Sequence, residues 1–379
     1  MWSLLLKRVI AIIPMLIVVS MFFFFLIKAS PHDEVDAHLE SQGISFQGDQ
    51  AMDQNIYNQT KIKLGLQLPY FYFSIVPNHY PAQLNALVDP DTEADIRREL
   101  KHKKGFFPKI IHHGIDNQFH HFIHKLMKGS FGISRVDGKP VSQKISSSFA
   151  WTIAMVIPTL LLSILCSIIL GFYQAFKVGS RFERWSSKIA DAIYIIPIFL
   201  MASLLLVFFT TREYGTWTNI FPTVDIIVPK TDSTWSTIAA NWQVLLLPTI
   251  ILTIHNIGYL SKQIKVSILN EKNKPYFNAL RAKGTSRTAI FKNHLLTNSL
   301  VPLITIITGV IPGLLAGSVV VEEICNVPGM GRLLYQSIIN ADWELSLPIV
   351  LLLAIIAVIS FLIGDMLYRW VNPKIQLTA

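Results

Sequence analysis

The segment YFNALRAKGTSRTAIFKNHLLTNSLVP, residues 276–302, decides the architecture because it is a basic, helix-forming stretch between two apolar runs. Residues 279–283 favour a helix, and Gly284 permits a turn after it. Ser286 can then cap a second helix that continues through Lys292. The segment is too polar to enter lipid and too rich in helix formers to be a plain linker. The sequence therefore predicts a docking surface for a soluble partner.

The chain around this segment has the composition of a membrane protein. Hydrophobic residues make up 51% of its 379 residues, and charged residues only 15%. About 20 consecutive apolar residues span a bilayer. The runs of this kind are Val9–Ile27, Trp151–Phe172, Ile189–Phe209, Val244–Leu260, Leu300–Val321 and Ser346–Tyr368. We therefore predict an all-α polytopic membrane protein with six transmembrane helices.

The positions of Lys and Arg predict the orientation. The loops after the second and fourth runs are rich in both residues, whereas the loop after the third run has only Arg212 and Lys230. Because short cytoplasmic loops collect positive charge, we expect both termini to be cytoplasmic. The net charge of +9 then reflects topology, and no nucleic-acid partner need be invoked.

The predicted organisation is one membrane domain with a large extracytoplasmic insertion between helices 1 and 2. Residues 1–30 contain the first transmembrane helix, and residues 31–148 form the extracytoplasmic segment. Residues 149–379 form a five-helix membrane core with a cytoplasmic loop at 261–297.

Within the extracytoplasmic segment, residues 32–59 are polar and turn-rich, and Asp89–Asp91 should open a charged helix that runs through Lys104. Between Asp116 and Met127 the apolar residues recur at helical spacing. They are Phe119, Phe122, Ile123, Leu126 and Met127. We expect this helix to lie on the outer membrane surface or on neighbouring spans.

Histidines concentrate in the same segment. His113, Asp116, His120 and His124 recur at helical spacing, with His121 beside them. Imidazoles four residues apart can share a zinc or nickel ion. We favour the alternative, a wet polar face opposite the apolar stripe, because neither cysteine nor an HExxH motif accompanies them.

Polar and small residues inside the apolar runs mark two features. His255, followed by Asn256, either faces a translocation pathway or hydrogen-bonds between helices. The fifth run carries glycines at every fourth position and a proline between them, which lets another helix approach and permits a kink. These residues are Gly309, Pro312, Gly313 and Gly317. We interpret them as a helix-packing face, and lining of a central pathway is compatible with that role.

The chain lacks the motifs of an enzyme. No GxxxxGK[ST] sequence is present to bind ATP phosphates, and neither GxSxG nor a paired metal-ligand motif occurs. We therefore expect no catalytic residue, no metal and no cofactor on this chain. Energy for uphill transport would have to come from a partner or from an ion gradient.

The basic segment resembles the cytoplasmic loop of one transporter family. The matching residues are Tyr276, Arg281, Ala282, Lys283, Gly284, Ser286, Ile290, His294, Asn298 and Pro302. This order is similar to that of permease subunits in binding-protein-dependent ABC importers of the dipeptide, oligopeptide and nickel class. Val319–Glu322 with Pro328–Arg332 resembles the family's outer loop. The resemblance covers most of the chain except about residues 32–110, and Leu280 departs from it by replacing a small alanine.

The resemblance implies a mechanism and a set of partners. Two permease chains, by family habit a heterodimer, would form a pathway through the bacterial inner membrane. Two ATPase subunits, which carry ATP and Mg, would dock beneath, and an extracytoplasmic solute-binding protein would deliver the cargo. The predicted ATPase-coupling residues are Tyr276, Ala279, Arg281, Ala282, Lys283, Gly284, Ser286 and His294.

The resemblance leaves the cargo and two other classes of function open. Peptides are the leading cargo, and nickel or another small solute is the runner-up. An ion-coupled secondary carrier would have only His255 to bind a coupling ion. A membrane enzyme would have only the outer histidines for a catalytic cluster.

Overall fold

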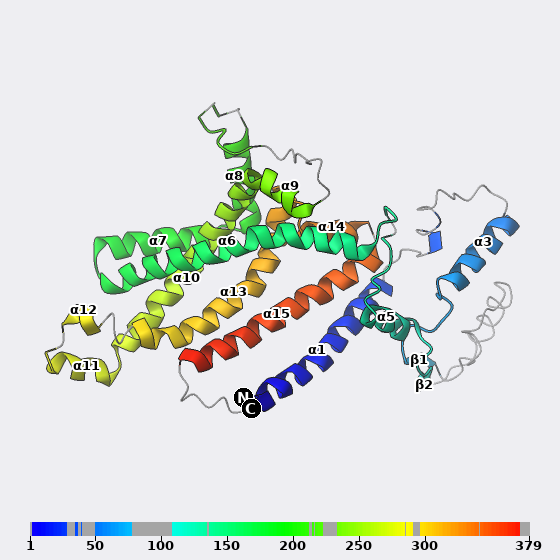
Figure 1. The fold of residues 1–379 in the computed structure, drawn as a ribbon, viewed down its shortest axis with the longest axis horizontal. Coiled ribbons are helices and arrows are strands. Elements are labelled where there is room, and N and C mark those ends of the chain that lie inside the picture. Colours follow the sequence, from blue (N-terminus) through cyan, green and yellow to red (C-terminus); the bar gives the residue numbers. More distant parts are fainter. Residues whose placement is uncertain are drawn as a thin grey trace. The chain divides into compact units, whose positions relative to one another are not determined.

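The computed structural model is mostly helical where it describes the chain (Figure 1). The described residues are 2–28, 35–36, 39, 50–77, 108–134, 136–211, 214–215, 217–222, 233–284, 286–290, 296–340 and 342–371. They form two compact units. The larger unit contains residues 1–16, 143–339 and 349–379, and the smaller unit contains residues 17–142 and 340–348.

The elements follow one another in a simple order. The N-terminal half has α1 (Trp2–Lys28), α3 (Gln50–Lys63), β1 (Phe73–Pro77), β2 (Pro108–His112), α5 (Gln118–Met127) and α6 (Val141–Phe176). Next come α7 (Arg181–Ile195), α8 (Ile198–Thr210), α9 (Thr234–Ala240), η2 (Trp242–Leu245) and α10 (Leu246–Lys272). The rest are α11 (Pro275–Ala282), α12 (Arg287–Ile290), α13 (Leu296–Ile324), α14 (Met330–Ile339) and α15 (Trp343–Val371).

Four helical segments of the described chain are long and apolar enough to cross a membrane. They are Val141–Phe176, Trp242–Lys272, Leu303–Ile324 and Trp343–Leu367. A bent helix pair would raise the number to five, and Ile13–Leu26 is a shorter apolar stretch within α1. A helical membrane protein is therefore confirmed, whereas the six-helix count stays a prediction.

The third apolar run is not one straight helix. We predicted a single span at Ile189–Phe209, but α7 and α8 meet at 97° around Ile196 and Pro197. Proline lacks the N–H that would continue the helix and disfavours helical geometry in the residue before it. Ile196 accordingly has an extended backbone, with ψ of 122°. The segment is a broken span or a re-entrant hairpin.

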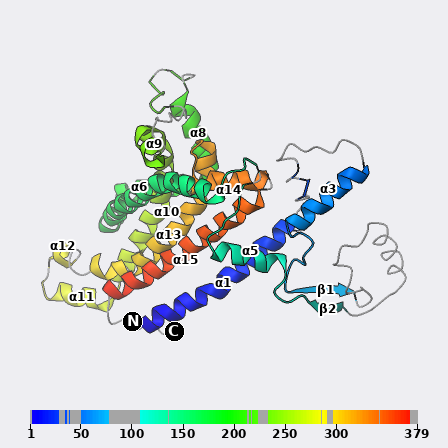
Figure 2. The same cartoon turned by 45° about the vertical axis from the view of Figure 1, so that its right-hand side comes forward.

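Close helix contacts in the larger unit occur at isolated glycines. A side chain at Gly171 on α6 would meet the Ser261 carbonyl of α10 at 2.7 Å, and one at Gly258 on α10 would meet the Ala190 carbonyl of α7 at 2.6 Å. Gly364 on α15 faces Thr308 of α13. Figure 2 shows α10, α13 and α15 running side by side. These glycines therefore allow the helices to approach closely.

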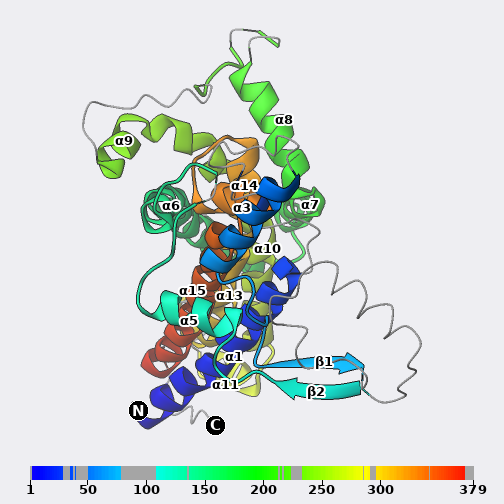
Figure 3. The same cartoon turned by 90° about the vertical axis from the view of Figure 1, so that its right-hand side faces the viewer.

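The smaller unit contains the antiparallel hairpin of β1 and β2 and the amphipathic helix α5 (Figure 3). Asn117 caps α5 by accepting a 2.8 Å hydrogen bond from the His120 amide. On the predicted apolar face Phe119 is buried, whereas Met127 is 82% exposed. A helix was therefore correctly predicted here, starting two residues later than Asp116.

The prediction for the first half of the extracytoplasmic segment is wrong for residues 50–59. These residues belong to α3, which runs to Lys63. Asp and Asn are common in turns, which is why this stretch was predicted to be turn-rich. No glycine or proline interrupts residues 50–63, so a helix can form there. The charged helix expected from Asp89 to Lys104 lies outside the described residues.

Candidate functional site

A cavity of about 480 Å³ lies in the larger unit between α7, α8, α10 and α13. It is lined by Tyr194, Ile198, Leu252, His255, Asn256, Tyr259, Thr305, Ile306, Gly309, Val310, Gly313, Leu314 and Gly317. The structure thus brings together four of the five residues predicted to pack helices or line a pathway. Pro312 lies on the same helix but is not part of the lining.

The glycine row of α13 leaves space open instead of packing tightly. A side chain added at Gly309 or Gly313 would meet no described atom within 4 Å. At Gly317 it would touch Ile198 at 3.6 Å and Leu252 at 3.9 Å, which is ordinary contact. Within the described chain, the first two glycines therefore form a smooth wall of the cavity rather than a contact between helices.

An aromatic stack forms the opposite wall. The Tyr194 ring lies 5.6 Å from the His255 ring and 5.6 Å from the Tyr259 ring, at interplanar angles of 35° and 30°. His255 Nδ1 is buried and has no hydrogen-bond partner among the described residues. Asn256 instead donates a 2.7 Å hydrogen bond to the Leu252 carbonyl of its own helix. The wall therefore offers flat aromatic faces and one imidazole nitrogen without a protein partner.

The basic segment folds as a helix, a turn and a second helix. Gly284 follows α11 with φ of +79°, a left-handed conformation that glycine adopts without strain. Ser286 then accepts a 3.3 Å hydrogen bond from the Ala289 amide and so caps α12. These features confirm the predicted turn and cap, although only Arg287–Ile290 of the second helix is described.

Several of the coupling residues predicted from the sequence are exposed on this segment. Ala279, Ala282, Lys283 and Ser286 are exposed, and Arg281 lies within α11. Tyr276 is half-buried and donates a 3.1 Å hydrogen bond to Glu271 at the end of α10. His294 lies outside the described residues.

A small hydrophobic cluster fixes the segment to the helices beneath it. Phe277 and Ile290, one from each short helix, are buried with Ile264, Ile268 and Leu303. Leu280, which departs from the family pattern, is half-buried against the same cluster. Its larger side chain therefore adds to the packing of α11 on α10 and α13.

Ion pairs between α7 and α10 were not predicted from the sequence. Lys265 pairs with Glu183 and donates a 3.1 Å hydrogen bond to Ser187, and Lys262 pairs with Asp191 at 2.9 Å. The four charges lie about 70 to 80 residues apart in sequence, so no local spacing reveals them. They connect the helix leading to α11 with the helix before the bend.

A buried carboxylate organises the other end of α13. Glu322 is fully buried and accepts hydrogen bonds from Thr152 Oγ1 at 2.9 Å and from the Arg332 amide at 3.0 Å. Thr152 in turn accepts a 2.7 Å hydrogen bond from the Met330 amide. Glu322 and Thr152 thereby satisfy free amides in the first turn of α14. The family-like Val319–Glu322 and Pro328–Arg332 motifs signalled Glu322, but nothing in the sequence pointed to Thr152.

We expect Thr152→Val to lower the stability of the protein by about 1–3 kcal/mol, because it leaves the Met330 amide without its acceptor and removes a donor from Glu322. Thr159→Val is a matched control on the same helix, since the buried Thr159 hydroxyl donates only to the Met155 carbonyl. Thermal unfolding in detergent measures both. Equal melting temperatures for the two variants would contradict a bridging role for Thr152.

The outer histidines make contacts within the smaller unit. His120 Nδ1 lies 3.1 Å from the Tyr72 hydroxyl, and His113 Nε2 lies 2.5 Å from the Ser74 hydroxyl. His121 pairs with Asp116 at 2.9 Å. Among the described residues, no group of three or more His, Cys, Asp or Glu side chains could hold a metal ion. His113 and Asp116 precede α5, so the helical face predicted from their spacing does not include them. His121 and His124 are exposed on α5, in agreement with a polar face there.

Comparison with known proteins gives a family match. The family of binding-protein-dependent transport system inner membrane components matches residues 167–377. The chain is 28% identical over 309 residues to the glutathione transport system permease protein GsiC of Escherichia coli K12, covering 82% of this chain and 92% of that protein. GsiC of Shigella dysenteriae serotype 1 has the same identity to this chain and the same coverage of both chains.

Two of the solved structures that match the chain have TM-scores below 0.5. An inward-facing structure of the MetNI methionine ABC transporter is 17% identical, with a TM-score of 0.48 over 61% of this chain and 97% of that chain. An amino acid ABC transporter with histidines is 13% identical, with a TM-score of 0.44 over 60% and 94% of the two chains.

Proposed function

The chain belongs to the binding-protein-dependent transport system inner membrane components, and on that premise we propose that it forms half of a pathway for peptides. It is a permease subunit of an ABC importer and a multi-pass protein of the inner membrane. Permeases of this kind have no ATPase activity of their own, so partner subunits hydrolyse ATP. ATP and Mg accordingly belong to those partners.

The observation that carries the pathway proposal is the cavity in which the glycine wall of α13 faces the stack of Tyr194, His255 and Tyr259. Glycines keep the space open, and aromatic faces with an imidazole can contact a flat, polar amide group. We propose that this cavity is this subunit's share of the pathway. A second permease chain, different from this one, would supply the facing half.

Peptide cargo is supported by the relatives. GsiC is named as a glutathione transport permease, and glutathione is a tripeptide. Nickel or another small solute is the second candidate, because the resemblance extends to nickel importers. An ion-coupled carrier is disfavoured, since among the described membrane helices only His255 offers an Asp, Glu, His or Lys side chain well inside a span.

We propose that the ATPase docks on the exposed side of α11, Gly284 and α12. The cluster of Phe277, Ile290 and Leu303 supports this proposal because it would pass a force on α11 directly to α13. Arg281 and Lys283 can pair with acidic groups of the partner. In the same proposal the chain has six spans, both termini are cytoplasmic, and residues 31–148 are extracytoplasmic.

The proposed complex can be tested by mass spectrometry of proteins that co-purify with this chain from native membranes in mild detergent. We expect an ATPase, a second permease and a solute-binding protein, with peptide bound to the last of these. If nickel were bound to the solute-binding protein instead, the cargo would be nickel and the peptide proposal would be wrong. Recovery of the chain alone after crosslinking at Lys283 would favour a self-sufficient carrier.

The pathway role of His255 predicts a specific change in transport. His255→Ala should lower peptide uptake by about tenfold, because it removes one ring of the aromatic wall and its polar nitrogen. Thr253→Val is the control, since Thr253 is buried on the same helix but does not line the cavity. Uptake in reconstituted vesicles measures both. Equal uptake by the two variants would place the pathway elsewhere.

A further inference from the structure

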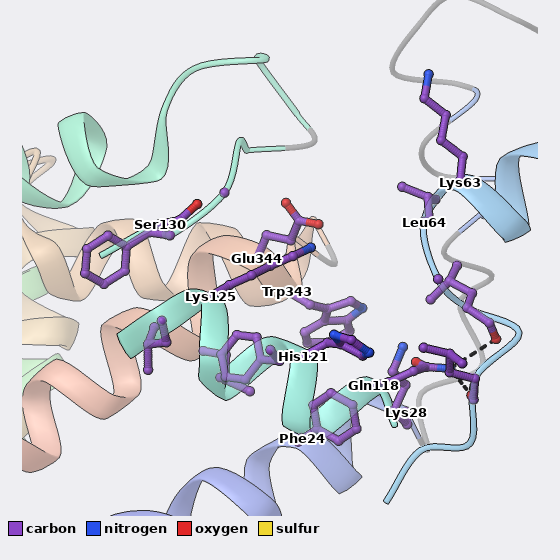
Figure 4. A pocket seen from close by; sticks show the side chains of 18 of the residues that line it. Phe24, Lys28, Lys63, Leu64, Gln118, His121, Lys125, Ser130, Trp343 and Glu344 are labelled. Carbon is purple, nitrogen blue, oxygen red and sulfur yellow. Dashed lines mark hydrogen bonds between the residues drawn. The ribbon is translucent and has the colours of Figure 1, made fainter. Parts of the chain in front are cut away.

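The smaller unit contains a cavity of about 360 Å³ that the proposed pathway does not use. It lies among the end of α1, the loop after α3, helix α5 and the start of α15 (Figure 4). We refer to it as the helix-end pocket. Its lining includes Phe24, Lys28, Leu66, Leu68, Gln118, His121, Phe122, Lys125, Leu126, Trp343, Glu344 and Leu347. Its volume suits a small ligand or a headgroup.

The helix-end pocket is held together by long-range hydrogen bonds. The Gln118 amide group donates to the Leu66 carbonyl at 3.0 Å and to the Leu68 carbonyl at 2.7 Å. Ser134 donates a 2.5 Å hydrogen bond to Asp342, and both residues are buried. The first contact fixes the loop after α3 on α5, and the second fixes residues 130–134 next to the start of α15. The pocket is therefore a built feature of the fold.

One buried polar atom of a lining residue has no hydrogen-bond partner among the described residues. Gln118 is only 8% exposed, and its amide hydrogens are used on the two carbonyls. Its Oε1 atom is buried and accepts no hydrogen bond from any described residue. A buried acceptor without a donor costs free energy. A ligand that brings a hydroxyl or ammonium group would remove that cost.

The pocket also offers cations beside an apolar wall. Lys28 and Lys125 line the pocket, whereas Lys63 points away from it in Figure 4. The Lys28 ammonium lies 5.5 Å from the centre of the Phe24 ring and 5.7 Å from that of the Tyr70 ring. Glu344 is the only carboxylate among the lining residues. The apolar wall consists of Phe24, Phe122, Leu126 and Leu347. The site therefore suits a molecule with an anionic group, a hydrogen-bond donor and an apolar part.

The helices that form the pocket place it at a membrane surface. Lys28 is the last residue of α1, directly after its apolar stretch, and Trp343 is the first residue of the apolar helix α15. Lysine and tryptophan at the ends of spanning helices lie at the level of lipid headgroups. An apolar wall that continues into the spanning segment of α15 and the shorter apolar stretch of α1 can follow an acyl chain, which a short soluble peptide lacks.

We propose that the helix-end pocket binds the headgroup of a phospholipid whose phosphodiester carries a hydrogen-bond donor, as in phosphatidylethanolamine. The phosphate lies near Lys28 and Lys125, and the ammonium group donates to Gln118 Oε1. The glycerol and the first part of the acyl chains lie against Phe24 and Phe122. Phosphatidylcholine has the same phosphate but no N–H, so it leaves Gln118 Oε1 without a partner.

Native mass spectrometry can test this proposal on the full-length chain, purified with its associated subunits and delipidated. We expect phosphatidylethanolamine to bind about tenfold more tightly than phosphatidylcholine. Lys125→Gln should weaken binding of phosphatidylethanolamine by about tenfold, because one charge-assisted hydrogen bond to phosphate is lost. Lys128→Gln should leave it unchanged, since Lys128 ends the same helix but is exposed and outside the pocket.

Three outcomes would overturn the proposal. Equal binding of the two lipids would show that Gln118 does not select a donor. Equal binding by the two lysine variants would place the lipid elsewhere on the protein. Displacement of the lipid by excess glycerophosphoethanolamine or by dialanine would assign the pocket to a soluble phosphodiester or to a peptide instead.

Discussion

Gly331→Ala will destabilise the protein by about 1–3 kcal/mol, although alanine normally favours a helix over glycine. The new methyl group would lie 2.6 Å from the Val319 Cα atom and 2.8 Å from Glu322 Oε2. The first of these is backbone and cannot move without shifting α13. The clash would also separate Glu322 from the first turn of α14, where it accepts a hydrogen bond from the Arg332 amide.

Gly309→Ala is the matched control for this effect. Gly309 lies on α13, and an added methyl group there meets no described atom within 4 Å. We expect its melting temperature in detergent to equal or exceed that of the unmodified protein. A melting temperature of Gly331→Ala that is as high as that of Gly309→Ala would contradict the close approach of α14 to α13.

Gly284→Pro will abolish peptide uptake while the protein still inserts into the membrane. Proline holds φ near −65°, whereas Gly284 has φ of +79°. Forcing this change costs roughly 3 kcal/mol, or about a hundredfold in the population of the native turn. We expect ATP hydrolysis by the reconstituted complex to continue without transport, because α11 no longer moves together with α12.

Gly284→Asn separates the role of the backbone from that of the side chain. Asparagine adopts the left-handed conformation at small cost, so this variant should retain most of its uptake. Normal uptake by Gly284→Pro would contradict the proposal that the turn couples ATP hydrolysis to transport. Loss of uptake in both variants would show that the partner fits tightly against Gly284 and that the side chain, not the turn, is decisive.

Features that depend on neighbouring residues were predictable from the sequence. The turn at Gly284 and the cap at Ser286 follow from local chemistry, and the structure confirms both. The break between α7 and α8 was also visible, since Pro197 lies inside the apolar run. The run was nevertheless predicted to be one straight span, because a hydropathy average does not depend on the backbone hydrogen bond that proline removes.

Features that depend on distant residues were not predictable. Thr152 and Glu322 lie 170 positions apart, and only the packed helices bring them together. The spacing of glycines also indicates where a neighbouring helix could approach closely, but it does not show whether a helix is present there. The repeated glycines at 309 and 313 border open space, whereas the isolated Gly171, Gly258 and Gly364 make the tight contacts. A repeat motif is therefore a weaker guide here than the three-dimensional neighbours.

The two ends of α13 are held in different ways. Leu303 near one end is buried with Phe277 and Ile290, and Glu322 near the other end accepts a hydrogen bond from the first turn of α14. Neither end can shift without carrying its attached segment along. We therefore propose that any bending of α13 falls between them, where Gly309, Pro312 and Gly313 weaken the helix and open space lies beside the two glycines. In that proposal the smooth wall of the cavity is also a hinge, and a force applied at α11 by a docked ATPase would change the width of the cavity before it reaches α14.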